Sequence, residues 1–323
     1  MIEVQNLTKR YGSHVAVNNI SFKVEEGEIL GFLGPNGAGK TTTMNILTGY
    51  LSASSGVAKI NDFDVLEQPN QAKMNIGYLP EQPPLYLDMT VREYLDFMFD
   101  LKKCKLSRQK HIAEICRLVK IETVYGRLIK NLSKGYRQRV GLAQALIGNP
   151  PVLIMDEPTV GLDPKQIIEI RSLIKSLGKN HTVILSSHIL QEIEAVCDRI
   201  IIINNGVLIA DDTASNLAKK NSSDRRLILR VAGEEDEVFT VLNRVPGAKN
   251  VTSHGEKESG VFEFSIEPDE DIDIRREVSA RISARNWAIM GMQSMEMTLE
   301  EVFIALTREQ YVNVKPKKGG RSK

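Results

Sequence analysis

The segment from Gly34 to Thr41 constrains this chain more than any other. It reads GPNGAGKT, fits the pattern GxxxxGK[ST], and lies between an expected strand at 28–33 and an expected helix that runs to about Gly49. Glycines, which lack a Cβ, let backbone N–H groups curve around a phosphate, and a helix N-terminus adds partial positive charge. Lys40 is then expected to reach the β- and γ-phosphates of a nucleotide, and the Thr41 hydroxyl to bind Mg²⁺. These features predict a nucleotide-binding α/β fold.

A second motif, VLIMDE, is an apolar strand at 152–155 that ends in two carboxylates. Asp156 is expected to hold Mg²⁺ directly or through water, and Glu157 to orient or deprotonate an attacking water molecule. An isolated Asp-Glu pair after a strand is more often a solvated turn. The phosphate loop upstream favours the functional interpretation here.

Strand and helix patterns alternate along the first two thirds of the chain, which predicts an α/β core with a largely parallel sheet. A mostly helical insert is expected at about 90–147, opened by a capping box of Thr90 and Glu93. The expected strands are 2–7, 16–24, 28–33, 152–155 and 182–185, the expected helices are 163–178 and 188–196, and a hairpin turn is expected at Asn205-Gly206.

Three parts are predicted: a nucleotide-binding domain at 1–217, a small α+β domain at 218–310, and a basic tail at 311–323. A polar run at 218–226 is interpreted as the linker between the two domains. The second domain shows a βαββαβ order that closes with a helix capped by Thr298 and Glu301.

The composition excludes several classes of protein. The 323 residues carry 42 Lys+Arg against 41 Asp+Glu, a net charge of +1, so no nucleic-acid partner is expected. No apolar run approaches the roughly 18 residues that span a bilayer, and no signal peptide is recognised. The three cysteines form no CxxC motif and are expected to be reduced thiols.

Together these motifs resemble the ATP-binding subunit of ABC transporters. The segment NLSKGYRQR at 131–139 is similar to the family signature and precedes the second motif, as in that family. His188, in LSSH, matches the switch histidine, and Asp163, in GLD, matches the loop aspartate. Tyr11 lies where the family stacks an aromatic side chain on adenine. The resemblance covers about 1–217 and implies the ABC nucleotide-binding fold.

The resemblance implies a head-to-tail dimer in which ATP lies between two copies, with Ser133 and Gly135 of one copy contacting the γ-phosphate held by the other. It also implies that His188 bonds the γ-phosphate and that Asp163 links the two sites. The implied catalytic residues are Glu157, His188 and Lys40, and the implied metal ligands are Thr41, Glu81 and Asp156. The implied nucleotide-binding residues are Tyr11, Gly34, Pro35, Asn36, Gly37, Ala38, Gly39, Lys40, Thr41, Thr42, Ser133, Gly135 and Asp163.

Two departures from the family pattern matter. The usual signature is LSGGQ, but here Lys134 replaces a glycine and Tyr136 replaces the glutamine. The family also has a glutamine after the strand IGYLP that couples Mg²⁺ and water to the membrane partner. Glu81 stands at that place with Gln82 next to it, and the residues leave open which of the two acts.

The sequences of the motifs are similar to those of bacterial ABC-2 exporter ATPases, a class that includes drug, lipid, bacteriocin and gliding-motility systems. The implied function is an ATPase with ATP and Mg²⁺ that drives a permease in another chain, at the cytoplasmic face of the membrane. The alternative is a soluble ABC ATPase acting on the ribosome or on DNA, which usually has two such domains or long coiled coils. The second domain is either a dimer-stabilising appendage or a regulatory module.

Overall fold

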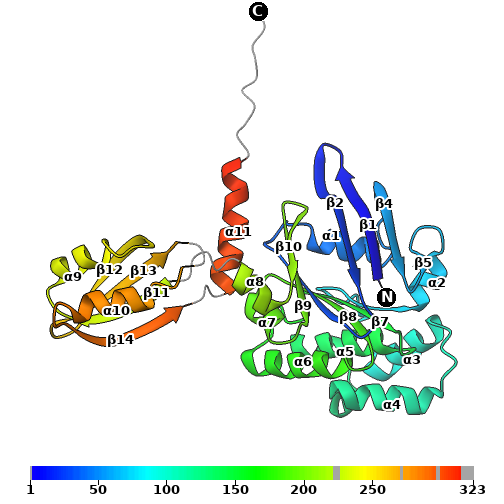
Figure 1. The fold of residues 1–323 in the computed structure, drawn as a ribbon. Coiled ribbons are helices and arrows are strands. Elements are labelled where there is room, and N and C mark those ends of the chain that lie inside the picture. Colours follow the sequence, from blue (N-terminus) through cyan, green and yellow to red (C-terminus); the bar gives the residue numbers. More distant parts are fainter. Residues whose placement is uncertain (1, 221–225, 270–271, 296–298, 314–323) are drawn as a thin grey trace, which may run out of the picture. The chain divides into compact units, whose positions relative to one another are not determined.

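The computed structural model describes residues 2–220, 226–269, 272–295 and 299–313 (Figure 1). The chain divides into a larger unit that ends at Thr213 and a smaller unit that begins at Ala214. This division lies a few residues before the predicted boundary at 217/218.

A six-stranded sheet forms the centre of the larger unit, in the order β10-β9-β3-β8-β7-β6. All neighbouring strands are parallel except β9 and β10, which form the predicted hairpin. The strands are β3 (Ile29–Leu33), β6 (Ile76–Leu79), β7 (Val152–Asp156), β8 (Thr182–Ser187), β9 (Arg199–Asn204) and β10 (Val207–Asp212). Strands β3, β7 and β8 are buried along their whole length, which explains their continuous apolar runs.

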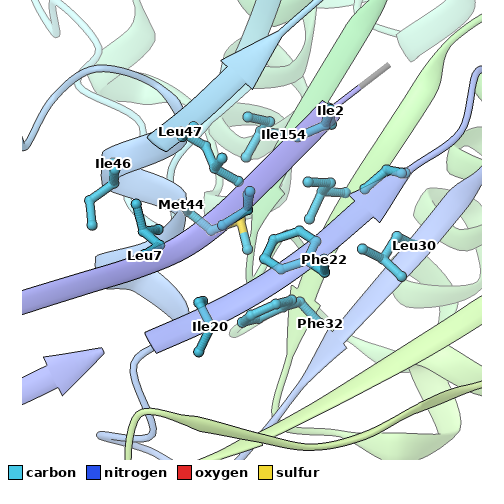
Figure 2. Packing of buried hydrophobic residues seen from close by; sticks show 14 of the residues in the cluster. Ile2, Leu7, Ile20, Phe22, Leu30, Phe32, Met44, Ile46, Leu47 and Ile154 are labelled. Carbon is cyan, nitrogen blue, oxygen red and sulfur yellow. The ribbon is translucent and has the colours of Figure 1, made fainter. Parts of the chain in front are cut away.

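A second, antiparallel sheet has the order β2-β1-β4-β5. Its strands are β1 (Ile2–Tyr11), β2 (His14–Val24), β4 (Ser55–Ile60) and β5 (Phe63–Asp64). Helix α1 (Lys40–Leu47) packs with strands of both sheets in one apolar cluster (Figure 2). Met44 of α1 lies among side chains of β1 to β3 there, and the rings of Phe22 and Phe32 lie 5.6 Å apart. This core anchors the start of α1, and with it the phosphate loop.

The region between β6 and β7 is helical, as predicted. It contains α3 (Val91–Leu101), α4 (Arg108–Val119), two short 3₁₀ turns and α5 (Lys134–Leu146). The capping box predicted at Thr90 and Glu93 is present at the start of α3. A further short helix, α2 (Pro69–Met74), precedes β6.

Helices α6 (Pro164–Leu177) and α7 (Leu190–Glu194) follow β7 and β8. Helix α6 has the predicted bounds, because Asp163 and Gln166 form a capping box at its start. The predicted helix 188–196 is wrong at both ends. Residues 188 and 189 stay outside the helix, next to hydrogen bonds of Ser187 that are described below, and the helix ends at Glu194.

The smaller unit contains a four-stranded antiparallel sheet in the order β12-β13-β11-β14. Side chains of α9 and α10 pack with this sheet in one apolar core that includes Val238, Val278 and Phe264. The elements in chain order are α8 (Ala214–Lys220), β11 (Arg226–Ala232), α9 (Glu235–Leu242), β12 (Ala248–Glu258), β13 (Val261–Pro268), α10 (Arg275–Ser283), β14 (Ala288–Met295) and α11 (Leu299–Asn313).

The predicted linker 218–226 is corrected in part, because α8 continues to Lys220 and β11 begins at Arg226. The predicted cap Thr298 and most of the predicted tail, 314–323, lie outside the described residues. Within the described residues, none of the helices has the length and apolar character needed to cross a membrane.

Candidate active site

The phosphate loop between β3 and α1 fits so closely against its neighbours that two of its glycines have no room for a side chain. A Cβ at Gly34 would lie 2.4 Å from the backbone oxygen of Ile203, and a Cβ at Gly39 would lie 2.5 Å from that of Ala16. Gly39 also has a φ of 108°, a left-handed conformation that favours glycine. The backbone of this loop is therefore held by β2 and by the β9–β10 hairpin.

Lys40, the first residue of α1, points back into the loop. Its Nζ donates hydrogen bonds to the carbonyl oxygens of Gly34 at 2.9 Å and Pro35 at 3.3 Å, and lies 3.3 Å from Oε1 of Glu157. The side chains of Lys40 and Glu157 are only 6% and 7% exposed. A buried cation and a buried carboxylate therefore face each other across the site, and each offsets the desolvation cost of the other.

The other polar residues reach this point because parallel strands end at the same edge of the sheet. Leu33 at the end of β3 is the register partner of Ser187, and Asp156 at the end of β7 is the partner of Ser186. Residues that follow β3, β7 and β8 thus converge there, which is where open α/β sheets bind ligands. Residues more than 100 positions apart in the sequence, such as Leu33 and Ser187, become neighbours through this strand register.

Asp156 is deeply buried and surrounded by hydroxyl groups. The hydroxyl of Ser186 donates to Oδ1 of Asp156, and the Thr41 hydroxyl also bonds the carboxylate. Burial raises the pKa of Asp156 above its usual range, and the hydrogen bonds from Ser186 and Thr41 oppose that rise. A buried carboxylate beside a hydroxyl is an oxygen donor set that suits Mg²⁺, so the residues fit this cation.

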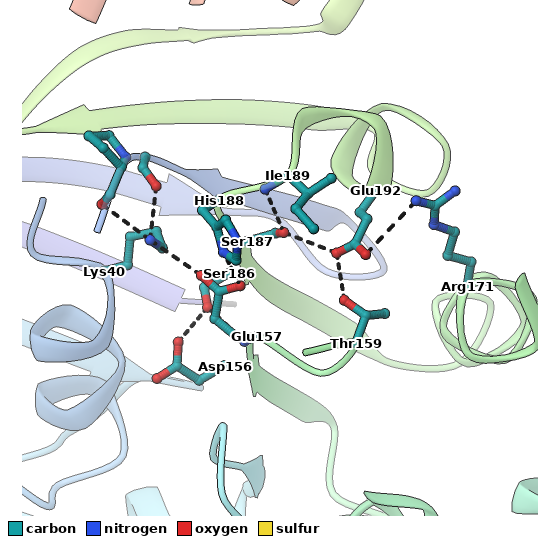
Figure 3. A network of polar contacts seen from close by, with 12 residues as sticks. Lys40, Asp156, Glu157, Thr159, Arg171, Ser186, Ser187, His188, Ile189 and Glu192 are labelled. Carbon is teal, nitrogen blue, oxygen red and sulfur yellow. Dashed lines mark hydrogen bonds and ion pairs between the residues drawn. The ribbon is translucent and has the colours of Figure 1, made fainter. Parts of the chain in front are cut away.

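Glu157 lies one residue beyond β7 in a strained conformation, with a φ of 48°. Its N–H donates to the Ser186 carbonyl at 3.2 Å and to the Ser186 hydroxyl at 3.0 Å. Its Oε2 lies 2.8 Å from Nδ1 of His188 (Figure 3). The carboxylate is thus held between Lys40 and His188, so the three predicted catalytic residues are in contact.

One cleft of about 520 Å³ joins the phosphate loop, the carboxylate and the adenine-stacking candidate. Its lining residues are Tyr11, His14, Ala16, Asn36, Gly37, Gly39, Lys40, Thr41, Thr42, Glu81, Glu157, Val160 and His188. Tyr11 is 46% exposed, so its ring is available to a ligand. Glu81 lines this cleft and Gln82 does not.

Three predicted site residues lie elsewhere. Gly135 and Asp163 line a separate cleft of about 350 Å³ between α5 and α6, and Ser133 is the N-cap of α5 beside it. A Cβ at Gly135 would lie 2.6 Å from Oε1 of Gln166, so α5 and α6 approach closely at that glycine. The exchanged signature residue Lys134 lies over Gly161, where a Cβ would be 2.0 Å from its Nζ.

Sequence reasoning missed several residues that the structure brings to the site. His14 belongs to none of the motifs described above, but it is the register partner of Tyr11 and lines the first cleft. The short turn between two alternating strands was a signal that could have placed it there. Ser186 was not singled out either, although it bonds both Asp156 and Glu157. No local sequence signal distinguishes this buried serine from other strand residues.

The arrangement suits attack by water on a terminal phosphate. It provides backbone N–H groups and the ammonium group of Lys40 for phosphate oxygens, and the carboxylate of Glu157 beside the imidazole of His188. Oxygen atoms of Asp156 and Thr41 are available for a metal ion. Phosphoryl transfer needs little more than such positioning and charge stabilisation.

The comparisons with known proteins agree with this geometry. A model of the ABC transporter family matches residues 17–160. The linearmycin resistance ATP-binding protein LnrL of Bacillus subtilis (strain 168) is 32% identical over 95% of this chain and 98% of its own length. The bacitracin transport ATP-binding protein BcrA of Bacillus licheniformis is 39% identical over 68% of this chain and 72% of its own length.

Solved structures give the same result. An ATP-binding subunit of an ABC transporter superposes with a TM-score of 0.63 at 29% identity, over 68% of this chain and 92% of that one. A dimeric, post-hydrolysis structure of the ATP-binding cassette MJ0796 with ADP and Pi has a TM-score of 0.61 at 27% identity, over 66% of this chain and 98% of that one. The chain therefore belongs to the ABC transporter family and is an ATP-binding, ATP-hydrolysing subunit of that family.

Proposed function

We propose that two copies of this chain form a head-to-tail dimer that binds two ATP molecules and drives a permease of the ABC-2 export type, at the cytoplasmic face of the cell membrane. LnrL is named for linearmycin resistance and BcrA for bacitracin transport, and LnrL matches nearly the whole chain. The alternative, a soluble ATPase acting on the ribosome or DNA, is not favoured by any of these relatives.

The observation that carries the dimer is the division of the site residues between two clefts. Lys40, Glu157 and His188 line one cleft, whereas Gly135 and Asp163 line the other. In a head-to-tail dimer the second cleft of one copy faces the first cleft of its partner. Ser133 and the N–H of Gly135 then reach the γ-phosphate from the other side, and each site is complete only in the dimer.

In this proposal each residue has one task. The loop N–H groups and Lys40 bind the phosphates, and Tyr11 stacks on the base. Glu157 takes a proton from the attacking water at its Oε atoms, because its carboxylate is the buried base beside Lys40. His188 keeps Glu157 oriented through Nδ1 and presents its other ring nitrogen to the γ-phosphate.

Asp156 and Thr41 would hold Mg²⁺, with Glu81, which lines the same cleft as Thr41, as a further ligand. Mg²⁺ bound there supplies positive charge for the β- and γ-phosphate oxygens. The placement of Glu81 on the cleft wall supports Glu81 rather than Gln82 as the coupling residue.

The substitution Glu157→Gln tests the proposal. It keeps the size of the side chain but removes the base, so we expect ATP to bind while turnover falls by about 100-fold or more. The bound ATP should then trap the dimer, which light scattering after size-exclusion chromatography would detect as a doubled mass with Mg²⁺ and ATP. A variant that hydrolyses ATP at the wild-type rate would remove Glu157 from this role, and one that stays monomeric would contradict the dimer.

A further inference from the structure

We propose that Glu192 is a positioning residue for ATP hydrolysis, because it ties the loop that carries His188 to the loop that follows Glu157. This inference rests on the proposed function, since it assumes that His188 and Glu157 act together on the γ-phosphate. Glu192 belongs to the short helix α7 and does not line the nucleotide cleft. Its side chain is 4% exposed, which is unusual for a carboxylate and requires close partners.

Three groups from different elements converge on this carboxylate (Figure 3). Oε2 of Glu192 accepts a hydrogen bond from the Thr159 hydroxyl at 2.5 Å and another from the Ser187 hydroxyl at 3.0 Å. Oε1 lies 3.9 Å from Nη2 of Arg171, which belongs to α6. Glu192 therefore connects the loops after β7 and β8 with the helix that begins after Asp163.

On the histidine side, the bonds hold both neighbours of His188. The Ser187 hydroxyl donates to Glu192 and at the same time accepts the N–H of Ile189 at 3.0 Å. A serine hydroxyl has one proton to donate and two lone pairs, so this arrangement uses its donor fully. The backbone on either side of His188 is thereby fixed, which keeps residues 188 and 189 out of α7.

On the carboxylate side, Thr159 is two residues beyond Glu157. The loop between them is closed by a hydrogen bond from the Val160 N–H to the Glu157 carbonyl at 3.2 Å. Holding the Thr159 hydroxyl therefore restrains the turn in which Glu157 adopts its left-handed conformation. The 2.8 Å contact between His188 and Glu157 joins two loops that share Glu192 as their anchor.

A charged group is needed at this position because the two oxygens of Glu192 serve different partners: Oε2 accepts from two hydroxyl groups, and Oε1 faces Arg171. A glutamine oxygen has two lone pairs and could still accept from both hydroxyl groups, but the amide NH₂ would then face the guanidinium in place of an acceptor. Arg171 also has a buried Nε that finds no hydrogen-bond partner among the described residues. Loss of the charge at Glu192 would leave that guanidinium without its carboxylate, at a cost to the local geometry.

The test compares Glu192→Gln with the matched pair Thr159→Val and Thr159→Ser in steady-state ATP hydrolysis by the full-length protein. We expect Glu192→Gln and Thr159→Val to lower kcat about 10- to 100-fold, the effect of slightly misplaced reacting groups. KM for ATP should stay within about threefold, because the phosphate loop is untouched. Thr159→Ser retains the hydroxyl and should restore nearly the wild-type kcat.

Glu28→Gln is the control, because Glu28 is a carboxylate that pairs with Arg199 at the other end of β3. It should lower stability while kcat stays at the wild-type value. A second readout is the NMR signal of the His188 imidazole, identified by its absence in His188→Ala. This signal should move in Glu192→Gln and Thr159→Val, and not in Glu28→Gln.

Wild-type kcat in Thr159→Val, or a fall in kcat with no movement of the His188 signal, would overturn the inference. If Glu192→Gln does not fold, the Thr159 pair decides the question alone. The two proposals fail in different ways. Full activity of Glu157→Gln overturns the proposed function, whereas an inactive Glu157→Gln beside a fully active Glu192→Gln overturns only the role of Glu192.

Discussion

At the scale of single residues, the charge of Asp156 serves the proposed Mg²⁺ site but lowers the stability of the folded protein when no cation is bound. Burial raises the pKa of Asp156, which means that the charged form costs folding free energy in the absence of a cation. The neutral substitution Asp156→Asn keeps an acceptor for Ser186 and removes this cost. We therefore expect Asp156→Asn to raise the Tm of the nucleotide-free protein at pH 7 by about 2–4 °C, and to abolish the further rise on addition of Mg²⁺ and ATP.

The sign of the pH dependence follows from the direction of the shift. The cost of the charge at Asp156 is fully present above the raised pKa of the folded protein and vanishes below the ordinary value of 3.8. The Tm difference between Asp156→Asn and the wild type should therefore shrink as the pH falls through this window in differential scanning fluorimetry. Asp88→Asn, at an exposed ion pair with Lys130, serves as the control and should change Tm little. A Tm of Asp156→Asn below that of the wild type, measured without ligands, would contradict the claim that the charge of Asp156 destabilises the nucleotide-free protein.

Residues with a local motif were predictable, and residues with only tertiary partners were not. The phosphate loop and the Asp156-Glu157 pair carry their signals in consecutive residues, and the structure brings Lys40, Glu157 and His188 into contact. Glu192 has no such signal. Its partners Thr159 and Ser187 become neighbours only when β7 and β8 pair in register, so nothing in the local sequence indicates that this acidic residue is buried.

At the scale of elements, the start of a helix was predicted correctly where the sequence carries a capping signal, and wrongly where it does not. Helix α6 begins as predicted because Asp163, Pro164 and Gln166 give a local start signal. Helix α7 is shorter than predicted because side-chain bonds of Ser187 compete with helical ones just before it. The α/β class with a largely parallel sheet is confirmed, since it depends on the alternation of many elements and not on the ends of any one.

Helix α5 ends on the partly buried ammonium group of Lys102, which gives a prediction for that helix. Nζ of Lys102 donates to the carbonyl oxygens of Gln144, Ala145 and Ile147 at 3.0 to 3.3 Å, where the last turn of a helix lacks partners. Burial lowers the pKa of Lys102 from 10.5 to about 8. The unfolded chain therefore binds more protons at this residue than the folded chain between these two values.

It follows that the stability contributed by Lys102 rises as the pH increases from about 8 towards 10.5. Urea unfolding of the wild type and of Lys102→Met at several pH values would measure this. The free energy of unfolding of the wild type, relative to Lys102→Met, should increase by at most about 1.4 kcal/mol for each unit of the pKa difference. Other lysines and tyrosines titrate equally in both proteins, so they cancel. A difference that is constant or falls over this range would contradict a lowered pKa of Lys102 in the folded protein.

At the scale of the whole molecule, the proposed head-to-tail dimer predicts a behaviour that cannot arise if each chain hydrolyses ATP alone. Lys40→Ala removes the charge that faces the phosphates, so we expect its own nucleotide site to be inactive. Ser133→Asp should inactivate the site of the partner instead, because its carboxylate would repel the γ-phosphate. Asp is also a favourable N-cap, so α5 should keep its start. Each variant alone is expected to hydrolyse ATP at the background rate.

A mixture of the two inactive variants should recover activity. In a mixed dimer, the intact phosphate loop of the Ser133→Asp copy faces the intact Ser133 of the Lys40→Ala copy, so one of the two sites is complete. Random pairing of equal amounts makes half of the dimers mixed, so the expected rate is about one quarter of the wild-type rate for independent sites. Recovery should require exchange of subunits, and Lys40→Ala mixed with Lys40→Ala,Ser133→Asp should stay inactive because no complete site can form. Mixtures that remain at background after exchange, while each variant is folded, would mean that Ser133 does not complete the site of a partner.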